Sequence, residues 1–242
     1  MSMTRKELNL AIFEGTTDRV LWQPRLEMWI DAHRADDTLP AHLKGLDRFG
    51  IYDALRCSPR YNVPSGLSTV DQGDKVWRRE EIDHEHRVHI IETPWGELRT
   101  IEKLVWEGDQ IVNHRIEEFA VSTPEDLRIV TKIIESDEFE IDPAAFLAAE
   151  AEQGGRAASS VICHSDGFTD LIKTYSGLLN ACFLLADAPK EMDAYIEACH
   201  GRDDRWLEKI FEIPCPIFNL GDHTTNEFTP PPILERYCMP RW

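Results

Sequence analysis

Arg25 is the first residue whose type and position could do chemistry. It follows the apolar run Val20–Trp22, where a guanidinium can hold a carboxylate through two parallel hydrogen bonds. The alternative is an ordinary surface arginine that pairs with Glu27 or Asp31. Position in the sequence leaves both interpretations open.

His164 and Asp166 lie close together directly after the apolar segment Ser159–Cys163. An imidazole beside a carboxylate can act as a general acid with its orienting partner. The alternative is a loop turn in which Asp166 caps a helix that begins near Phe168. Capping is the favoured interpretation for Asp166, whereas both interpretations stay open for His164.

Asp222 and His223 are the best of the three candidates. They follow Gly221, which permits a sharp turn, and they come directly after the apolar segment Pro216–Leu220. A carboxylate and an imidazole at a strand end are an uncommon structural choice. The alternative is again capping, here of a helix that begins near Thr229.

Short apolar strands must position these side chains. Strands are expected near residues 20–24, 50–54, 159–163 and 216–220, with helices between the later ones. Strands that alternate with helices favour βαβ units around a parallel sheet, and in a parallel barrel the chemistry lies at the carboxyl ends of the strands. The predicted fold class is therefore α/β, an incomplete (β/α)8 TIM-type barrel. A complete one needs eight strands and about 250 residues, so we expect truncation on the C-terminal side.

One helix start carries a strong local signal, and a second helix follows it. Thr123 can cap a helix in which Pro124 takes the first position, and a second helix is expected over Pro143–Gln153. Residues 76–121 differ from the rest, because 88–92, 98–105 and 111–119 resemble strands joined by tight turns. This segment predicts an antiparallel β-meander inserted in the barrel domain.

Composition narrows the classes of partner. The chain has 242 residues and a formal net charge of −18, a field that repels nucleic-acid backbones and anionic lipid. Any anionic substrate must therefore meet a local basic cluster. The N-terminus lacks the apolar stretch of a secretory signal and no membrane-spanning segment is apparent, so we expect a cytoplasmic protein.

Metal chemistry finds little support in the residue spacing. The six cysteines are scattered and form no C-x-x-C pair, which favours reduced structural thiols over a zinc site. The histidines of the segment 84–89 fall on the expected meander and are interpreted as a solvated edge. We therefore predict no metal ligands, and no nucleotide-binding or serine-hydrolase motif is present.

The order of several motifs is familiar. An opening helix leads into Asp18–Arg25, and the turn Thr93–Leu98, the helix start Ser122–Leu127, Leu220–Asp222 and Pro232–Cys238 follow. Together these resemble the uroporphyrinogen decarboxylase superfamily, which includes the decarboxylase proper and cobamide-dependent methyltransferases. The resemblance spans nearly the whole chain and implies one (β/α)8 barrel domain over residues 1–242.

The resemblance also implies site residues and a reaction. In the decarboxylase a W-x-x-R motif and a second arginine hold the substrate's carboxylates, and Trp22 and Arg25 match its first part. The second arginine is absent from Leu26–Ile30. We assign Arg25, Trp22 and His223 to substrate binding and Asp222 and His164 to catalysis.

The expected activity is that of a carboxy-lyase of porphyrin biosynthesis, which decarboxylates uroporphyrinogen without a metal or organic cofactor. One alternative is a cobamide-dependent methyltransferase, which would use zinc and a corrinoid protein partner and whose zinc ligands would lie beyond Trp242. Another is an inactive barrel fragment or binding protein that self-associates, for example as a homodimer. The expected small-molecule partner is a tetrapyrrole.

Overall fold

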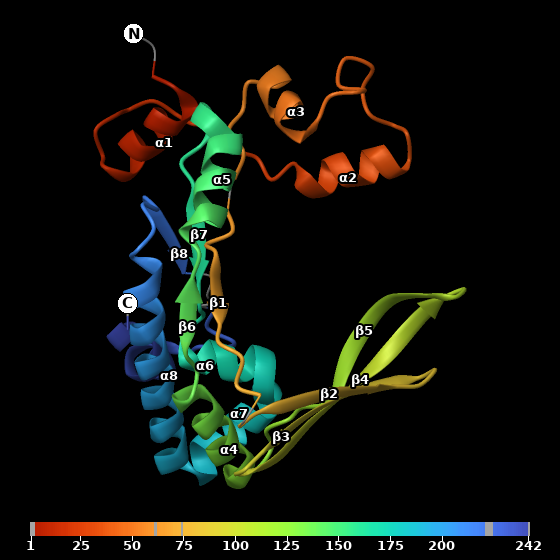
Figure 1. Ribbon diagram of the computed structural model, residues 1–242, viewed down its shortest axis with the longest axis vertical. Coiled ribbons are helices and arrows are strands. Elements are labelled where there is room, and N and C mark those ends of the chain that lie inside the picture. The colour runs from red at the N-terminus through yellow and green to blue at the C-terminus, as the bar shows by residue number, and fades with distance from the viewer. Residues whose placement is uncertain (1–2, 61, 74, 221–224, 242) are drawn as a thin grey trace. The chain divides into compact units, whose positions relative to one another are not determined.

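The structure, a computed structural model, describes residues 3–60, 62–73, 75–220 and 225–241 (Figure 1). It divides into two compact units, each built from segments that are far apart in the sequence. The first unit contains Met1–Leu67, Ile141–Cys163 and Ile210–Asn219, and the second contains Ser68–Glu140, His164–Lys209 and Leu220–Trp242. None of the described helices is long and apolar enough to cross a membrane.

The first unit is mainly helical. Its elements are α1 (Arg5–Phe13), α2 (Glu27–Ala35), α3 (Arg48–Ala54), α5 (Pro143–Gln153), β7 (Ser160–Cys163) and β8 (Ile217–Leu220), the last of which ends at the unit's border. Side-chain caps set three of the helix starts, because Thr4, Asp47 and Asp142 each accept a hydrogen bond from a backbone N–H of the first turn.

A small core holds α2 and α3 together in this unit. Ile30, Leu43, Ile51, Tyr52 and Cys57 are buried there. Their burial removes apolar surface from water and stabilises by roughly 1.5–3 kcal/mol for each large aliphatic side chain. The segments on either side of this core are thereby held in place.

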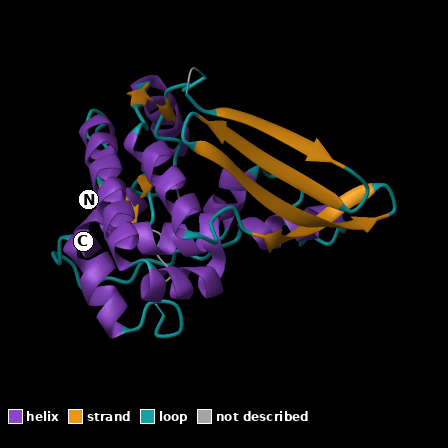
Figure 2. Ribbon diagram, turned by 90° about the horizontal axis from the view of Figure 1, so that it is seen from below, coloured by secondary structure: helices purple, strands orange, loops and turns teal. Residues whose placement is uncertain are grey.

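The second unit contains an antiparallel sheet. Its strands are β2 (Trp77–Ile82), β3 (His86–Thr93), β4 (Gly96–Glu107) and β5 (Gln110–Glu118), paired in that order (Figure 2). The meander expected over residues 76–121 therefore has four strands, whereas the sequence predicted three. The prediction missed β2, whose residues are all exposed and largely charged, as suits an edge strand.

Helices complete the second unit. They are α4 (Pro124–Glu135), α6 (Gly167–Asp170), a π-helix (Leu171–Ser176), α7 (Gly177–Asp187), α8 (Pro189–Ile210), α9 (Pro231–Ile233), a second π-helix (Leu234–Cys238) and a final 3-10 turn (Met239–Arg241). The two predicted helices are confirmed: Thr123 caps α4 with Pro124 in its first turn, and α5 of the first unit covers Pro143–Gln153. The core of this unit includes Leu127, Ile134, Phe168, Met192 and Tyr195.

The prediction of an incomplete (β/α)8 TIM-type barrel is wrong. Besides the four-stranded antiparallel sheet, the described residues form only two-stranded sheets, β7 with β8 and β1 (Leu67–Thr69) with β6 (Phe139–Ile141). Residues 20–24 form no strand, and 50–54 lie in α3. Short segments with two or three apolar residues do not distinguish strand from helix, and the Asp47 cap selects helix for residues 50–54.

Candidate functional site

Trp22 and Arg25 lie in an irregular segment between α1 and α2 of the first unit. The Trp22 side chain is 58% exposed, and Arg25 is exposed as well. Since no strand precedes them, Arg25 does not stand at a strand end as predicted. Both side chains nevertheless lie where a ligand can reach them.

Two long-range hydrogen bonds hold this segment against residues 56–60. The backbone N–H of Ser58 donates to the carbonyl oxygen of Trp22 at 2.9 Å, and Gln23 Nε2 donates to the carbonyl oxygen of Pro59 at 2.9 Å. Two further exposed arginines, Arg56 and Arg60, belong to the facing segment. We call Arg19, Arg25, Arg56 and Arg60 the arginine cluster.

The arginine cluster is locally basic in an acidic chain. Residues 17–25 and 56–60 contain these four arginines and a single acidic residue, Asp18. Nearby Asp53 forms ion pairs with Arg5 and Arg156. Burial opposes ionisation of Asp53, but hydrogen bonds from both arginines outweigh it and hold the pKa of its carboxyl below the ordinary value. Asp53 therefore stays charged, and its ion-pair partners Arg5 and Arg156 lie outside the arginine cluster.

Arg25 does not form the surface ion pair with Glu27 or Asp31 that was the alternative to a binding role. Glu27 accepts a hydrogen bond from the Tyr52 hydroxyl at 2.9 Å, and Asp31 lies 3.5 Å from Arg48. Within the described part of the chain, the Arg25 guanidinium has no ion-pair partner. Its charge is available to an external anion.

Arg56 has strained backbone geometry. Its φ is 54°, in the left-handed region that costs a residue with a Cβ free energy relative to glycine. Such strain is commonly kept where a side chain has a function. Here the conformation follows the end of α3, directly before the residues that hydrogen-bond to Trp22 and Gln23.

His164 begins the second unit's share of the chain after β7. Its Nδ1 lies 3.4 Å from Asp203 Oδ1, and its ring contacts those of Phe139 and Trp206 at centroid distances of 5.9 and 5.3 Å. The imidazole is thus oriented by a carboxylate on one side and by two aromatic rings, while its side chain remains 35% exposed. This arrangement suits a general acid or base.

Asp203 is itself fixed by a buried arginine. Arg202 is 6% exposed and donates to Asp203 Oδ1 at 3.2 Å and to Asp170 Oδ2 at 3.0 Å. Burial disfavours the charged guanidinium, but its anionic surroundings outweigh burial and raise the pKa of Arg202. The buried, charged Arg202 therefore holds the Asp203 carboxylate in position beside His164.

Other predicted residues have different outcomes. Asp166 caps α6, accepting from the backbone N–H of Thr169 at 2.9 Å, so the capping interpretation is confirmed. Asp222 and His223 lie outside the described residues. Among the side chains that the structure describes, no group of three or more His, Cys, Asp or Glu could hold a metal ion.

Sequence reasoning missed four residues that the structure adds to these sites. Arg56 and Arg60 flank Cys57–Pro59, a segment that is joined to Trp22 and Gln23 by two hydrogen bonds that no short motif encodes. Asp203 lies 39 residues after His164, and Arg202 precedes it on α8. Two adjacent charged residues on a helix carry no signal of their own.

Comparisons with known proteins identify no relative. No protein-family model, no curated protein and no solved structure matches this chain.

Proposed function

We propose that the chain binds the carboxylates of a tetrapyrrole through the arginine cluster and that its reaction is decarboxylation of a uroporphyrinogen-like substrate. The observation that carries the proposal is the pair of hydrogen bonds from Ser58 to Trp22 and from Gln23 to Pro59. They bring Arg56 and Arg60 to the segment of Trp22 and Arg25. We propose that one of these two arginines takes the role of the second arginine, which the linear motif lacks.

The charge distribution supports a polycarboxylate ligand. A chain with a net charge of −18 repels anions at long range, so an anion binds only where several cations converge. Guanidinium groups match carboxylates with paired hydrogen bonds. The exposed indole of Trp22 adds a flat apolar surface against which a pyrrole ring can stack.

The reaction requires proton transfer. Decarboxylation releases CO2 and adds a proton to the carbon atom that carried the carboxylate. Within the second unit, His164 is suited to proton exchange, because Asp203 orients its Nδ1 side and leaves Nε2 for exchange with water or with a ligand bound in that unit.

Binding is tested by titrating the protein with uroporphyrin and following tryptophan fluorescence. We expect saturable binding that weakens with added salt and with fewer carboxylates, as in coproporphyrin. Arg25→Ala and Arg56→Ala should each weaken binding by about tenfold, the effect of losing one charge-assisted hydrogen bond. Arg99→Ala is the matched control, since Arg99 is an exposed arginine of β4 outside the cluster.

Turnover is tested by incubating the protein with reduced uroporphyrinogen and separating the products by their number of carboxylates. Absence of uroporphyrin binding by a protein with an intact circular dichroism spectrum would overturn the proposal. Binding of a methylcobamide in place of the porphyrin would support the corrinoid-dependent methyltransferase instead.

A further inference from the structure

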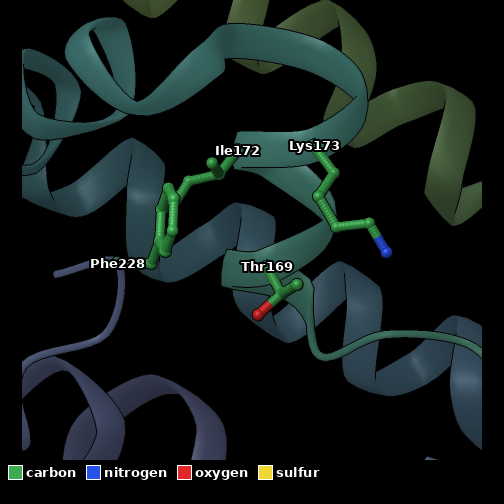
Figure 3. A pocket seen from close by; sticks show the side chains of 4 residues that line it. All are labelled: Thr169, Ile172, Lys173 and Phe228. Atoms are coloured by element: carbon green, nitrogen blue, oxygen red, sulfur yellow. The ribbon is translucent and has the colours of Figure 1, made fainter. Parts of the chain in front are cut away.

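A pocket in the second unit is lined by residues that the proposed function does not use. It has a volume of about 220 Å³ and is lined by Thr169, Ile172, Lys173 and Phe228 (Figure 3). In Figure 3 the side chains of Ile172 and Phe228 face each other, and the Lys173 ammonium lies on the side away from Phe228. The pocket thus has an apolar body and one cationic end.

An unusual helix geometry builds one wall. Thr169 lies on α6, and Ile172 and Lys173 lie on the π-helix Leu171–Ser176 that follows it. π-helical turns are rare and occur frequently at functional sites. The wall is held in place because Asp166 accepts hydrogen bonds from both the backbone N–H and the hydroxyl of Thr169, at 2.9 and 2.7 Å.

Phe228 supplies the opposite wall. Its backbone N–H donates to the carbonyl oxygen of Thr225 at 3.1 Å, and its side chain is 39% exposed. A phenyl ring this exposed beside a cavity has apolar surface that a bound apolar group removes from water, and this burial favours binding. The ring is therefore suited to pack against a bound apolar group.

The ammonium of Lys173 is available to a ligand. Its Nζ donates to the hydroxyl of Ser165 at 3.2 Å, and within the described part of the chain Lys173 forms no ion pair. Two acidic residues of this segment have partners of their own, since the N-cap Asp166 accepts from Thr169 and Asp170 forms an ion pair with Arg202. An ammonium has three N–H donors, so Lys173 can donate to a carboxylate and keep its hydrogen bond to Ser165.

We propose that this pocket binds a small aromatic carboxylic acid. The carboxylate pairs with Lys173, and the ring lies between Ile172 and Phe228. The size agrees, because an apolar cavity of about 150 Å³ holds benzene and the additional volume here accommodates a carboxylate. This site goes beyond the proposed tetrapyrrole function and does not depend on it.

The test uses phenylacetate as the probe, with phenylacetamide and phenethylamine as its neutral and cationic analogues, in calorimetric titrations of the full chain. We expect phenylacetate to bind with a stoichiometry of one at this site and to bind at least about tenfold more tightly than either analogue. Lys173→Met should remove this preference, and Phe228→Ala should weaken all three ligands. Lys190→Met, a substitution of an exposed lysine of α8, should change nothing.

A carboxylate could also bind at the arginine cluster, so the Arg25→Ala variant is titrated in parallel. Unchanged phenylacetate binding by Arg25→Ala, together with loss in Lys173→Met, assigns the ligand to the pocket. The proposal is overturned if phenylacetate does not bind, if phenethylamine binds equally well, or if Lys173→Met retains wild-type affinity.

Discussion

The backbone N–H of Ser58 donates a hydrogen bond to the carbonyl oxygen of Trp22 at 2.9 Å. This bond joins a segment that carries Arg25 to one that carries Arg56 and Arg60. It creates a basic surface in an acidic protein, and the surface contains a residue with strained backbone. Mutation can separate the positive charge of Arg56 from its backbone strain.

Replacement of Arg56 by glycine is expected to stabilise the protein and to weaken porphyrin binding. The φ of 54° is unfavourable for arginine and acceptable for glycine, so the free energy of unfolding should rise by about 0.5–1 kcal/mol. Uroporphyrin affinity should fall by about tenfold. Urea unfolding and fluorescence titration measure the two effects.

Asp37 provides the control for this prediction, because its φ of 51° is also left-handed and it lies outside the arginine cluster. Asp37→Gly should leave porphyrin affinity unchanged. Equal porphyrin affinity of Arg56→Gly and the wild type would argue against a binding role for Arg56.

Replacement of His164 by phenylalanine tests how the packing of its ring contributes to stability. Phenylalanine preserves a ring against Phe139 and Trp206, so the free energy of unfolding should change by less than about 1.5 kcal/mol. Urea unfolding measures the change. A larger loss would show that the contact between the imidazole and Asp203 also stabilises the second unit.

Gly177→Ala is expected to destabilise the second unit. Gly177 has a φ of +67°, and a Cβ there would lie 2.6 Å from Cε2 of Phe119. Backbone strain and the clash together should lower the free energy of unfolding by roughly 2–4 kcal/mol. Gly108 has a φ of +61° and open space around its Cβ position, so Gly108→Ala measures strain alone and should cost about 1 kcal/mol. Equal losses in the two variants would show that Phe119 moves aside freely.

The Cys199 thiol is expected to make stability depend on alkaline pH. Burial raises its pKa from 9.0 to about 12. Between these values the unfolded chain releases the proton and the folded chain keeps it. The protonated thiol therefore makes its full contribution to the free energy of unfolding below pH 9. This contribution is lost as the pH rises toward 12, at about 1.4 kcal/mol per pH unit.

Urea unfolding between pH 8 and about pH 11 measures this dependence. Cys199→Ala should show a smaller decrease in stability with pH than the wild type, whereas Cys182→Ala, a substitution of an exposed cysteine, should show the wild-type decrease. Identical pH profiles of Cys199→Ala and the wild type would contradict the assignment.

Local signals in the sequence predicted local structure. Thr123 with Pro124 predicted the start of α4, because a cap and a proline act within one helical turn. The helix expected over Pro143–Gln153 is α5. The segments 159–163 and 216–220 predicted β7 and β8 within one residue. These features depend on neighbours in the chain and need no distant partner.

Strand partners could not be predicted in the same way. The interpretation of residues 20–24 and 50–54 as barrel strands required strand neighbours that the described part of the chain does not provide for them, and the charged edge strand β2 carried no apolar alternation. Pairing depends on which segments meet after folding, and an apolar run of a few residues is compatible with several outcomes. The predicted fold class failed for this reason.

The sequence by itself determined the cap and turn residues, the acidic net charge and the presence of Trp22, Arg25 and His164 as residues able to do chemistry. Only the tertiary structure decided that Arg56 and Arg60 accompany Trp22, and that Asp203 orients His164. Caps act between residues a few positions apart. The contacts that build a site join residues tens of positions apart, and the collective burial of the two cores selects them.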